Sequence, residues 1–590
     1  MTTEFSPVFS GEINLPAEYP YPYVPETFTG EEGIILSHFF TNIDKPVFAI
    51  HNLPQEVVGA LFSRYSRTNK SIRRVFLDEF YEGSELSGDS LKVAKGKSQD
   101  FYKKVFTGFG DDSIIQMGSV HVASEFVSQI AAKAIEDQRI GAAYIEKSTR
   151  YVKFTSRDKN GHFLFAEVPE IMKSKLAEEF LLWNNSLFGA YTKHLPTTVE
   201  LFRKKYPLED QVFVDLKSRQ ELKLALMTKD EDRQKAKRAY ESAVTAKALD
   251  TIRVFLPATT VTNLGAHFSG QAAENAINKM LSSPHSEVRL LGAMAYEELQ
   301  KVASSFLRNI NHPYGRTQRD FLRESLAAQE RVSLSWLKGV KEKVDAEPVR
   351  LVDWDKDADV KIASQILYKN QPPGQSLSKE AIVDWCRAVK EKDNSVLPRI
   401  ILESVPDRKA GGRTRRQKLP RAFEQADAEV EFYLDFGVFR DLQRNRLSST
   451  ERQALSAEKV HIPEEFYEPG MEEVLRDYLQ LSQKTRDLNA KIRLSGDPLL
   501  AEAAEYVTIF GNKLRFNVRA NIRQWVFFAE LRTIEGGHTT YRNALQSAAR
   551  QIIEKMPFLE PLFAHVNWKK DCGLGRLGAE FKIQDSFGYL

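Results

Sequence analysis

Three side chains in the first third of the chain have types and spacing that suit a sugar phosphate. Residues 143–154 read AYIEKSTRYVKF, with Glu146, Ser148 and Arg150 at alternate positions. The aromatic and β-branched content predicts a strand, and strand alternation places the three side chains on one face. Arginine holds phosphate through two hydrogen bonds, serine adds a donor, and glutamate accepts from hydroxyl or ring N–H groups. The alternative is a solvated strand face carrying a Glu146–Arg150 ion pair.

A second candidate lies near the C-terminus, where residues 521–532 read NIRQWVFFAELR. Asn521 and Arg532 are eleven positions apart, which is about three helical turns, so a helix would present both on one face. Taken alone, Arg532 could instead be a cation that stabilises a helix C-terminus. The histidines are scattered without metal-ligand spacing, so no metal site is predicted.

Pairs of similar segments recur along the chain. Residues 47–50 look like a strand and lead into a helical stretch, and residues 349–354 do the same at an offset of 302. Residues 121–143 and 431–449 both carry apolar side chains at helical spacing, and aligning them gives an offset of 306. Two elements at nearly one offset indicate a diverged duplication, with coincidence as the alternative.

Composition narrows the class of protein. The chain has 83 Lys and Arg against 80 Asp and Glu, and this balance does not indicate a nucleic acid or a membrane surface as the main partner. Two cysteines are too few for a disulfide-stabilised secreted protein. No Lys or Arg precedes Lys45, which argues against a signal peptide. No apolar run approaches the ~20 residues that span a bilayer. We therefore expect a cytoplasmic protein.

Two segments together resemble the signature of flavin-dependent thymidylate synthases, R-H-R-x-x-S-x-N-E-x-S-x-R-Y. Residues 138–151 read QRIGAAYIEKSTRY and keep only its second part, E-x-S-x-R-Y. Residues 444–457 read RNRLSSTERQALSA and keep only its first part, with Asn445 in place of the family histidine. Each segment therefore resembles the part of the signature that the other has lost.

Other elements of that family divide in the same way. Residues 253–257, RVFLP, resemble the family's R-x-x-x-P strand, whereas Glu505 stands at the arginine position of the second repeat. Residues 521–532 resemble the family's N-x-R element and the helix that ends in Leu-Arg. The family's flavin loop is degenerate at residues 110–117, and the second repeat keeps only its Glu424.

The resemblance implies an α+β fold of two fused repeats, each a mixed sheet packed with long helices. The expected boundaries are an N-terminal Pro/Tyr-rich arm at 1–40, a nucleotide-holding repeat at 41–330 and a flavin-holding repeat at 345–590. A charged stretch at 228–250 is predicted to be a solvated helical insertion and not a site. Two chains are expected to form a homodimer that mimics the family's tetramer, with two live sites and two dead ones.

The implied activity is reductive methylation of dUMP to dTMP with FAD, NADPH and methylene-tetrahydrofolate. No membrane partner is expected. One composite site would have Arg532 as its catalytic residue at the pyrimidine. The nucleotide dUMP would be held by Glu146, Ser148, Arg150 and Arg253. FAD would be held by Glu424, Arg444, Arg446, Ser449, Asn521 and Arg523.

Two other functions remain open on the sequence. A non-catalytic descendant that binds flavin or nucleotide is favoured by Asn445 and by the degenerate flavin loop. A nucleic-acid-binding protein could use the basic loop at 408–421, although this loop has no interleaved aromatic residues for base stacking.

Overall fold

The computed structural model describes residues 24–81, 113–214, 221–341 and 347–586. Residues 1–23 of the expected arm and residues 110–112 of the degenerate flavin loop lie outside the described residues. The chain divides into two compact units. The first unit comprises Met1–Ala123, Ile140–Ile145 and Gly265–Trp336, and the second comprises Ser124–Arg139, Glu146–Leu264 and Leu337–Leu590.

The first unit is mainly helical. Its helices are α1 (Gly30–Ser37), α2 (Gln55–Tyr65), α3 (Ile72–Val75), α5 (Ser113–Gln116), α10 (Gly270–Leu281), α11 (Ser286–Ala303) and α12 (Pro313–Trp336). Helix α10 packs against α11 and α12. A three-stranded sheet, in the order β1-β5-β2, is formed by β1 (Ser119–Val127), β5 (Thr262–Ser269) and β2 (Ala142–Glu146). Each of these strands contains residues of both units.

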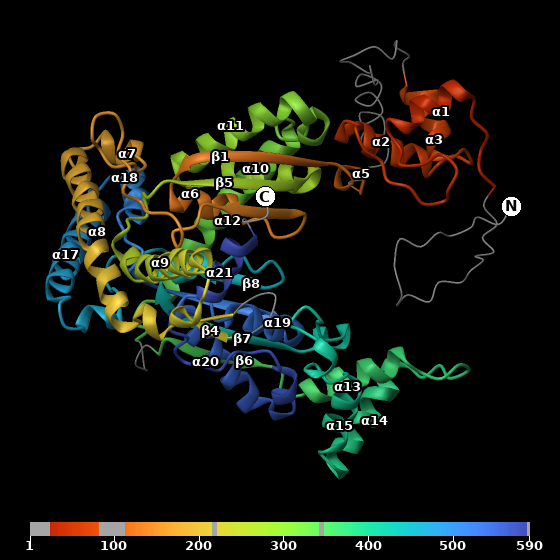
Figure 1. Cartoon of the computed structure of the whole chain (residues 1–590). Coiled ribbons are helices and arrows are strands. Elements are labelled where there is room, and N and C mark those ends of the chain that lie inside the picture. The colour runs from red at the N-terminus through yellow and green to blue at the C-terminus, as the bar shows by residue number, and fades with distance from the viewer. Residues whose placement is uncertain (1–23, 82–112, 215–220, 342–346, 587–590) are drawn as a thin grey trace. The chain divides into compact units, whose positions relative to one another are not determined.

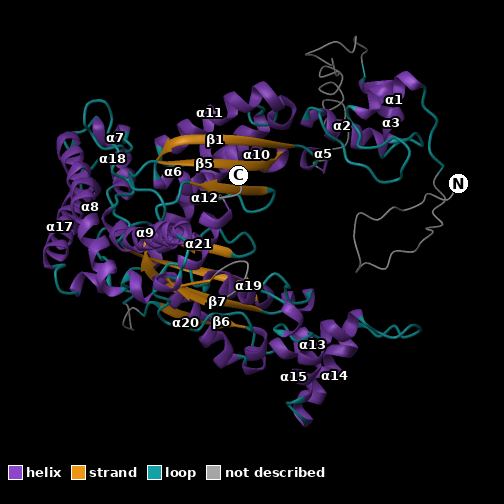
Figure 2. Cartoon of the chain, viewed as in Figure 1, coloured by secondary structure: helices purple, strands orange, loops and turns teal. Residues whose placement is uncertain are grey.

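The second unit contains an antiparallel four-stranded sheet in the order β6-β7-β9-β8. Figure 2 draws its strands β6 and β7 in orange. Its strands are β6 (Val349–Trp354), β7 (Asp427–Asp435), β8 (Ser449–Arg452) and β9 (Lys513–Asn521). Helices α16 (Phe436–Leu442), α19 (Ile522–Arg532) and α20 (Thr539–Lys555) pack on this sheet. A buried apolar core that includes Val430, Phe432, Phe516 and Trp525 joins the sheet to the helices.

Further helices surround this core in the second unit. Helices α8 (Ala177–Lys205) and α17 (Glu472–Arg493) lie side by side, as do α8 and α9 (Asp230–Ile252) (Figure 1). The remaining elements are α6 (Gln129–Ile135), α7 (Pro169–Met172), α13 (Ala358–Lys369), α14 (Lys379–Lys392), α15 (Val396–Glu403), α18 (Pro498–Glu502), α21 (Leu577–Ser586) and a hairpin of β3 (Val212–Val214) and β4 (Glu221–Lys223). No described helix has the length and apolar character needed to cross a membrane.

The duplication is visible where strands run directly into helices. Strands β1, β5, β7 and β9 are followed by α6, α10, α16 and α19. At each junction one polar side chain accepts a hydrogen bond from a backbone N–H of the first helical turn, and these caps are Ser128, Ser269, Asp435 and Asn521. Each cap satisfies a donor that the helix leaves without a partner. The order β1-β5-β2 also matches the order β7-β9-β8, so the two repeats share a topology.

The helical interpretation of residues 121–143 and 431–449 is wrong in its first part. Residues up to Val127 form β1, and residues up to Asp435 form β7, before α6 and α16 begin. Apolar residues four positions apart lie on one face of a strand as well as of a helix, so their spacing could not separate the two. The predicted strand at 349–354 and both helices that follow the paired segments are confirmed. At residues 47–50 only an isolated bridge from Ile50 to Phe40 forms.

Three further local predictions need correction. Strand β2 ends at Glu146. The chain then turns, because the Ser148 carbonyl accepts hydrogen bonds from the N–H groups of Tyr151 and Val152. The three polar side chains of this segment therefore do not share a strand face. The Arg253–Phe255 segment is a short 3-10 helix and not a strand. Helix α9 exists as predicted, but it is not merely solvated, because it has a buried face that packs against α8 and α21.

The two repeats meet through backbone atoms inside the second unit. Pro257 and Ile509 form an antiparallel bridge. Pro257 precedes the start of α10 by as many residues as Ile509 precedes the start of α19. The two residues therefore occupy equivalent positions in their repeats. The Ala258 N–H donates to the Thr508 carbonyl at 2.8 Å, and the Phe510 N–H donates to the Leu256 carbonyl at 2.8 Å. Equivalent segments of the repeats therefore pair with each other around a local pseudo-twofold axis.

Candidate functional site

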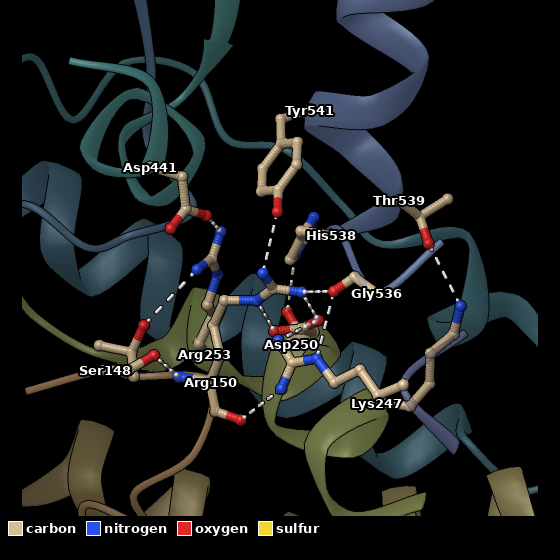
Figure 3. Close-up of polar contacts among 12 residues, drawn as sticks. Ser148, Arg150, Lys247, Asp250, Arg253, Asp441, Gly536, His538, Thr539 and Tyr541 are labelled. Atoms are coloured by element: carbon tan, nitrogen blue, oxygen red, sulfur yellow. Dashed lines mark hydrogen bonds and ion pairs between the residues drawn. The ribbon is translucent and has the colours of Figure 1, made fainter. Parts of the chain in front are cut away.

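Arg150 lies at the centre of a buried polar cluster in the second unit (Figure 3). Its Nε and Nη2 atoms each donate to one carboxylate oxygen of Asp250 at 2.8 Å. Nη1 donates to the Tyr541 hydroxyl at 2.9 Å, and Nη2 also donates to the Gly536 carbonyl at 3.1 Å. Burial alone would raise the pKa of Asp250, but the charge and hydrogen bonds of Arg150 outweigh burial and hold that pKa below its usual value. Both groups are therefore charged near neutral pH.

Arg253 forms a second buried ion pair beside the first (Figure 3). Its side chain is 2% exposed, and Nη2 donates to Asp441 at 2.8 Å. Burial favours the neutral acid, yet attraction to Arg253 and Arg150 keeps the pKa of Asp441 below its usual value. The elements that supply these residues are the end of α9, the 3-10 helix after it and helix α16.

His538 completes this cluster as a neutral side chain. Its Nδ1 accepts from the Thr540 N–H at 3.2 Å, which leaves Nε2 to donate to the Asp250 carbonyl at 3.1 Å. Burial and the nearby charge of Arg253 lower the pKa of His538 to about 4. The imidazole therefore caps α20 and positions the Asp250 backbone without adding charge at neutral pH.

Arg532 is the cation of the cluster that lacks a partner. Within the described part of the chain, its buried Nε has no hydrogen-bond partner and no carboxylate forms an ion pair with it. Its guanidinium carbon lies 5.9 Å from the ring centroid of Tyr541, and that of Arg150 lies 5.5 Å from the same centroid. Burial lowers the pKa of Arg532 below its usual value. The last residue of α19 therefore offers an unsatisfied donor next to the nucleotide candidates.

The candidate Glu146 belongs to a neighbouring network of opposite charges. Arg440 is 5% exposed and donates to Glu146 at 2.8 Å and to Glu136 at 3.2 Å. Nη1 of Arg444 lies 3.5 Å from Glu136 and 4.0 Å from Glu146. Burial raises the pKa of Glu136, although the adjacent arginines oppose this shift. Glu146 thus has protein partners and does not stand open to a ligand as its sequence position suggested.

The predicted flavin residues lie around the start of α19. Asn521 is its N-cap, with its Oδ1 accepting from the Gln524 N–H at 2.9 Å. The Gln524 side chain donates to Asn445, and this hydrogen bond links residues 444–446 to α19. Across the sheet, Ser449 lies opposite Arg519 of β9.

Arg523 and Glu424 are joined to each other and not to that segment. The Arg523 Nη1 atom donates to Glu424 at 3.0 Å, and its Nε donates to the Leu419 carbonyl at 2.6 Å. Arg444, by contrast, is 33% exposed, and its ion pairs with described residues are the longer ones to Glu136 and Glu146 given above. Of the predicted flavin residues, those of the 444–449 segment are therefore the more accessible to a ligand.

Sequence reasoning missed the residues that hold the arginines in place. Asp250, Asp441, Tyr541 and Arg440 come from distant parts of the chain and meet only in the folded protein. A buried arginine requires a carboxylate partner, but no sequence spacing identifies which carboxylate it will be. All the predicted site residues fall within the second unit. Arg150, Arg253 and Arg532 come together there, whereas Arg523 and Glu424 form a separate pair.

Comparison with known proteins gives a family model and several relatives. The family model described as "Thymidylate synthase complementing protein" matches residues 64–304 and 350–558. A UPF0159 protein of Chlamydia muridarum is 33% identical over 565 residues, which cover 94% of this chain and 98% of that protein. A UPF0159 protein of Chlamydia pneumoniae is also 33% identical, over 568 residues and the same shares of both chains. A UPF0159 protein of Thermoplasma acidophilum is 29% identical over 531 residues, or 89% of this chain and 98% of that protein. The two matched regions contain the segments that carry the resemblance and its duplication, which are thereby confirmed.

Proposed function

This chain belongs to the family of thymidylate synthase complementing proteins, and we propose that it is a flavin-dependent thymidylate synthase. The proposed reaction is the reductive methylation of dUMP to dTMP with methylene-tetrahydrofolate as carbon donor and NADPH as reductant. Both repeats contribute to one site in the proposal, because Arg150 and Arg253 come from the first repeat and Arg532 comes from the second.

The unsatisfied guanidinium of Arg532 carries this proposal. Leaving a buried donor without a partner costs about 1–3 kcal/mol, and no described residue relieves that cost at its Nε. A uracil carbonyl is an acceptor that would do so. A cation beside this carbonyl would also stabilise negative charge that develops on the ring during reaction at C5. The Tyr541 ring lies on one side of Arg532, with its centroid 5.9 Å from the guanidinium carbon.

The nucleotide phosphate would meet arginines that already hold carboxylates. Arg150 makes four hydrogen bonds to Asp250, Tyr541 and Gly536, so few of its donors remain. Arg253 donates to Asp441 at 2.8 Å, and its one other hydrogen bond to a described side chain is a 3.5 Å contact with Thr149. In the proposal Arg253 is thus the stronger phosphate contact, and Arg150 fixes the wall of the site.

The 444–449 segment fits a flavin better than the other predicted flavin residues. Nδ2 of Asn445 is buried and has no hydrogen-bond partner within the described chain, and Arg444, Arg446 and Ser449 flank it. An acceptor-rich diphosphate or flavin ring would satisfy the Asn445 Nδ2 donor. When bound, FAD would supply the hydride that completes the methyl group. In the proposal Asn521 shapes this segment by capping α19, and Glu424 orients Arg523.

Rescue of a thymidine auxotroph tests the proposal in cells, and tritium release from 5-labelled dUMP tests it in solution. We expect the intact chain to rescue growth and to release tritium only with NADPH and methylene-tetrahydrofolate. Arg532→Ala should abolish both, whereas Arg399→Ala, on the exposed face of α15, should abolish neither. Failure of the intact, folded chain in both assays would reject the catalytic proposal.

A second candidate function is binding of nucleotide or flavin without catalysis. The closed pairs Arg150–Asp250 and Arg253–Asp441 favour it, because a phosphate must compete with buried carboxylates for the same guanidinium groups. This candidate predicts measurable binding of dUMP or FAD with no tritium release. The pair of assays therefore separates the two functions.

A further inference from the structure

A glycine-rich segment near the C-terminus, CGLGRLG at residues 572–578, lies in the second unit and outside the region that the family model matches. Its Leu574 and Leu577, and Phe581 after them, belong to the buried apolar core. Helix α21, which begins at Leu577, packs against α9, and the last turn of α9 carries Asp250. The segment is therefore anchored next to the polar cluster and can hold a side chain in a fixed place.

Arg576 is the residue of this segment that reaches the turn after β2. Its side chain is 9% exposed. Its Nη1 atom donates to the Arg150 carbonyl at 3.2 Å, and its Nε donates to the Gly536 carbonyl at 3.3 Å. Its guanidinium carbon lies 4.4 Å from the ring centroid of Tyr151, and its Nη2 lies 3.8 Å from Asp250. One guanidinium thus holds two backbone carbonyls that come from different repeats.

These two carbonyls belong to the parts of the chain that carry the candidate arginines. The Gly536 carbonyl also accepts from Arg150 Nη2 at 3.1 Å (Figure 3). Gly536 lies in the loop that leads from Arg532, the last residue of α19, to His538, the N-cap of α20. Arg576 therefore holds the turn at Arg150 against this loop. We term its two carbonyl contacts the Arg576 clamp.

Gly575 shows that the clamp depends on the close approach of two backbones. A Cβ atom at Gly575 would lie 2.1 Å from the carbonyl oxygen of Glu535 and 2.6 Å from its carbonyl carbon. Those backbone atoms could move aside only if the whole loop were displaced, so glycine is required there. At Gly578, by contrast, no described atom lies within 4 Å of the corresponding position. An added methyl group would therefore disturb the clamp at Gly575 but not at Gly578.

We propose that Arg576 is a positioning residue of the candidate site, which fixes Arg150 against the loop that follows Arg532 so that both guanidinium groups face one ligand. In this role Arg576 itself does not touch the ligand. Without the clamp, Arg150 could keep its ion pair with Asp250 while the turn and the loop move apart. The consequence for dUMP binding rests on the proposed function, whereas the consequence for the loop does not.

Gly575→Ala tests the clamp while every polar side chain is retained. In calorimetric titration of the full chain, we expect it to weaken dUMP binding about tenfold, the loss of one well-placed hydrogen bond at Arg150. Flavin should stay bound, because its candidate residues at 444–449 lie on another segment. Gly578→Ala is the matched control and should bind both ligands as the unaltered chain does. Arg576→Met should act like Gly575→Ala, and Arg576→Lys, which can still donate to one carbonyl, should recover part of the loss.

His538 supplies a second measurement that needs no ligand. Its pKa is about 4, because burial and the charge of Arg253 oppose protonation. The other charged groups that act on it are those of Arg150, Asp250 and Asp441. In the unaltered chain its NMR signal should hardly move between pH 7.5 and 5.5. Displacement of the loop should hydrate the ring and bring its pKa toward about 6.5, so the signal should move in Gly575→Ala and not in Gly578→Ala. His538→Gln identifies the signal.

The two measurements separate a failure of the clamp from a failure of the proposed function. If the unaltered chain binds no dUMP, the proposed function is rejected, and the His538 signal alone decides on Arg576. The inference is overturned if Gly575→Ala and Gly578→Ala give the same His538 titration, if dUMP affinity stays unchanged although that signal moves, or if Gly575→Ala loses dUMP and flavin alike. If Gly575→Ala does not fold, Arg576→Met, which creates no steric overlap, replaces it in both measurements.

Discussion

Arg150 and Arg532 approach the same aromatic ring, with guanidinium carbons 5.5 Å and 5.9 Å from the centroid of Tyr541. One comes from the turn after β2 in the first repeat, and the other ends α19 in the second. Their environments differ, since both oxygens of Asp250 accept from Arg150, while the buried Nε of Arg532 has no hydrogen-bond partner among the residues that the structure describes. One ligand could therefore contact both, and Arg532 would gain more from it.

Replacing Arg532 separates a ligand contact from a structural contact. Because no described residue accepts a hydrogen bond from its Nε or forms an ion pair with its guanidinium, Arg532→Ala should leave the free energy of unfolding unchanged or slightly raised. Loss of a charge-assisted hydrogen bond costs about 1.5–3 kcal/mol, so affinity for dUMP should fall roughly 10- to 100-fold. Calorimetric titration and urea unfolding of the same preparation measure both. A large loss of stability with unchanged affinity would show that Arg532 is structural.

Replacing Asp250, unlike replacing Arg532, should lower the free energy of unfolding. Asp250→Asn leaves the buried guanidinium of Arg150 without its counter-charge, and breaking one side of a buried ion pair typically costs about 3–5 kcal/mol. We expect a marked fall in the denaturation midpoint. The double variant Asp250→Leu with Arg150→Met removes both charges and should recover much of that loss. If the double variant is no more stable than Asp250→Asn alone, the ion pair does not explain the effect.

His538 should make the protein less stable in mild acid. Its folded pKa of about 4 lies below the unfolded value of about 6.5, so the unfolded chain binds a proton that the folded chain does not. The stability that this difference contributes is fully present above pH 6.5 and falls as the pH drops toward 4. Between pH 7.5 and 5 the loss should reach about 2 kcal/mol. Urea unfolding at several pH values measures it, and His538→Gln should flatten the curve.

Asn521 distinguishes a helix cap from a flavin ligand. As the N-cap of α19 it accepts from the Gln524 N–H, so Asn521→Ala should cost about 1 kcal/mol of stability. Asn521→Asp keeps the accepting oxygen and should retain the stability. The equivalent cap of α10 provides the control, since Ser269→Ala should cost a similar amount. If Asn521→Asp is as unstable as the alanine variant, capping is not the role of this side chain.

The proposed division of labour between repeats can be tested with two alanine variants. Arg444→Ala should lose flavin while keeping most dUMP affinity, because among the described residues Arg444 forms ion pairs only with Glu136 and Glu146, at 3.5 and 4.0 Å, and it is one-third exposed. Arg253→Ala should weaken dUMP binding while keeping flavin. Flavin absorbance after gel filtration and nucleotide titration report the two affinities. Equal losses of both ligands in both variants would contradict the division.

Much of the repeat organisation could be predicted, because it depends on local sequence. The strand pattern of residues 349–354 predicts β6. The helical stretches after residues 47–50 and after residues 349–354 predict α2 and α13. The strand-to-helix switches at Ser128 and Asp435 were missed. Their flanking apolar residues fit both periods, and the deciding feature is a single capping hydrogen bond.

The site was harder to predict, because its decisive contacts join residues far apart in the chain. Arg150, Arg253 and Arg532 were candidates from the sequence, and they lie together. Which arginine is saturated depends on Asp250 and Asp441, which lie on α9 and α16. Helix α9 looked like a solvated insertion because of its many charged residues, yet ten of its 23 residues are buried. Only the folded chain shows that Asp250, near the end of this helix, neutralises Arg150, which the sequence predicted to bind phosphate.

The bridge between Pro257 and Ile509 bears on how the halves of the chain could diverge. Main-chain N–H and C=O groups form this joint, and any amino acid except proline supplies the N–H. Substitutions on either side therefore leave the register of the halves intact. A duplicated ancestor could lose its arginine at position 505, where Glu505 now pairs with Arg452, and still keep Arg253 where the other half needs it. The joint thus lets one copy lose ligand-binding residues while the other keeps them, without separating the two.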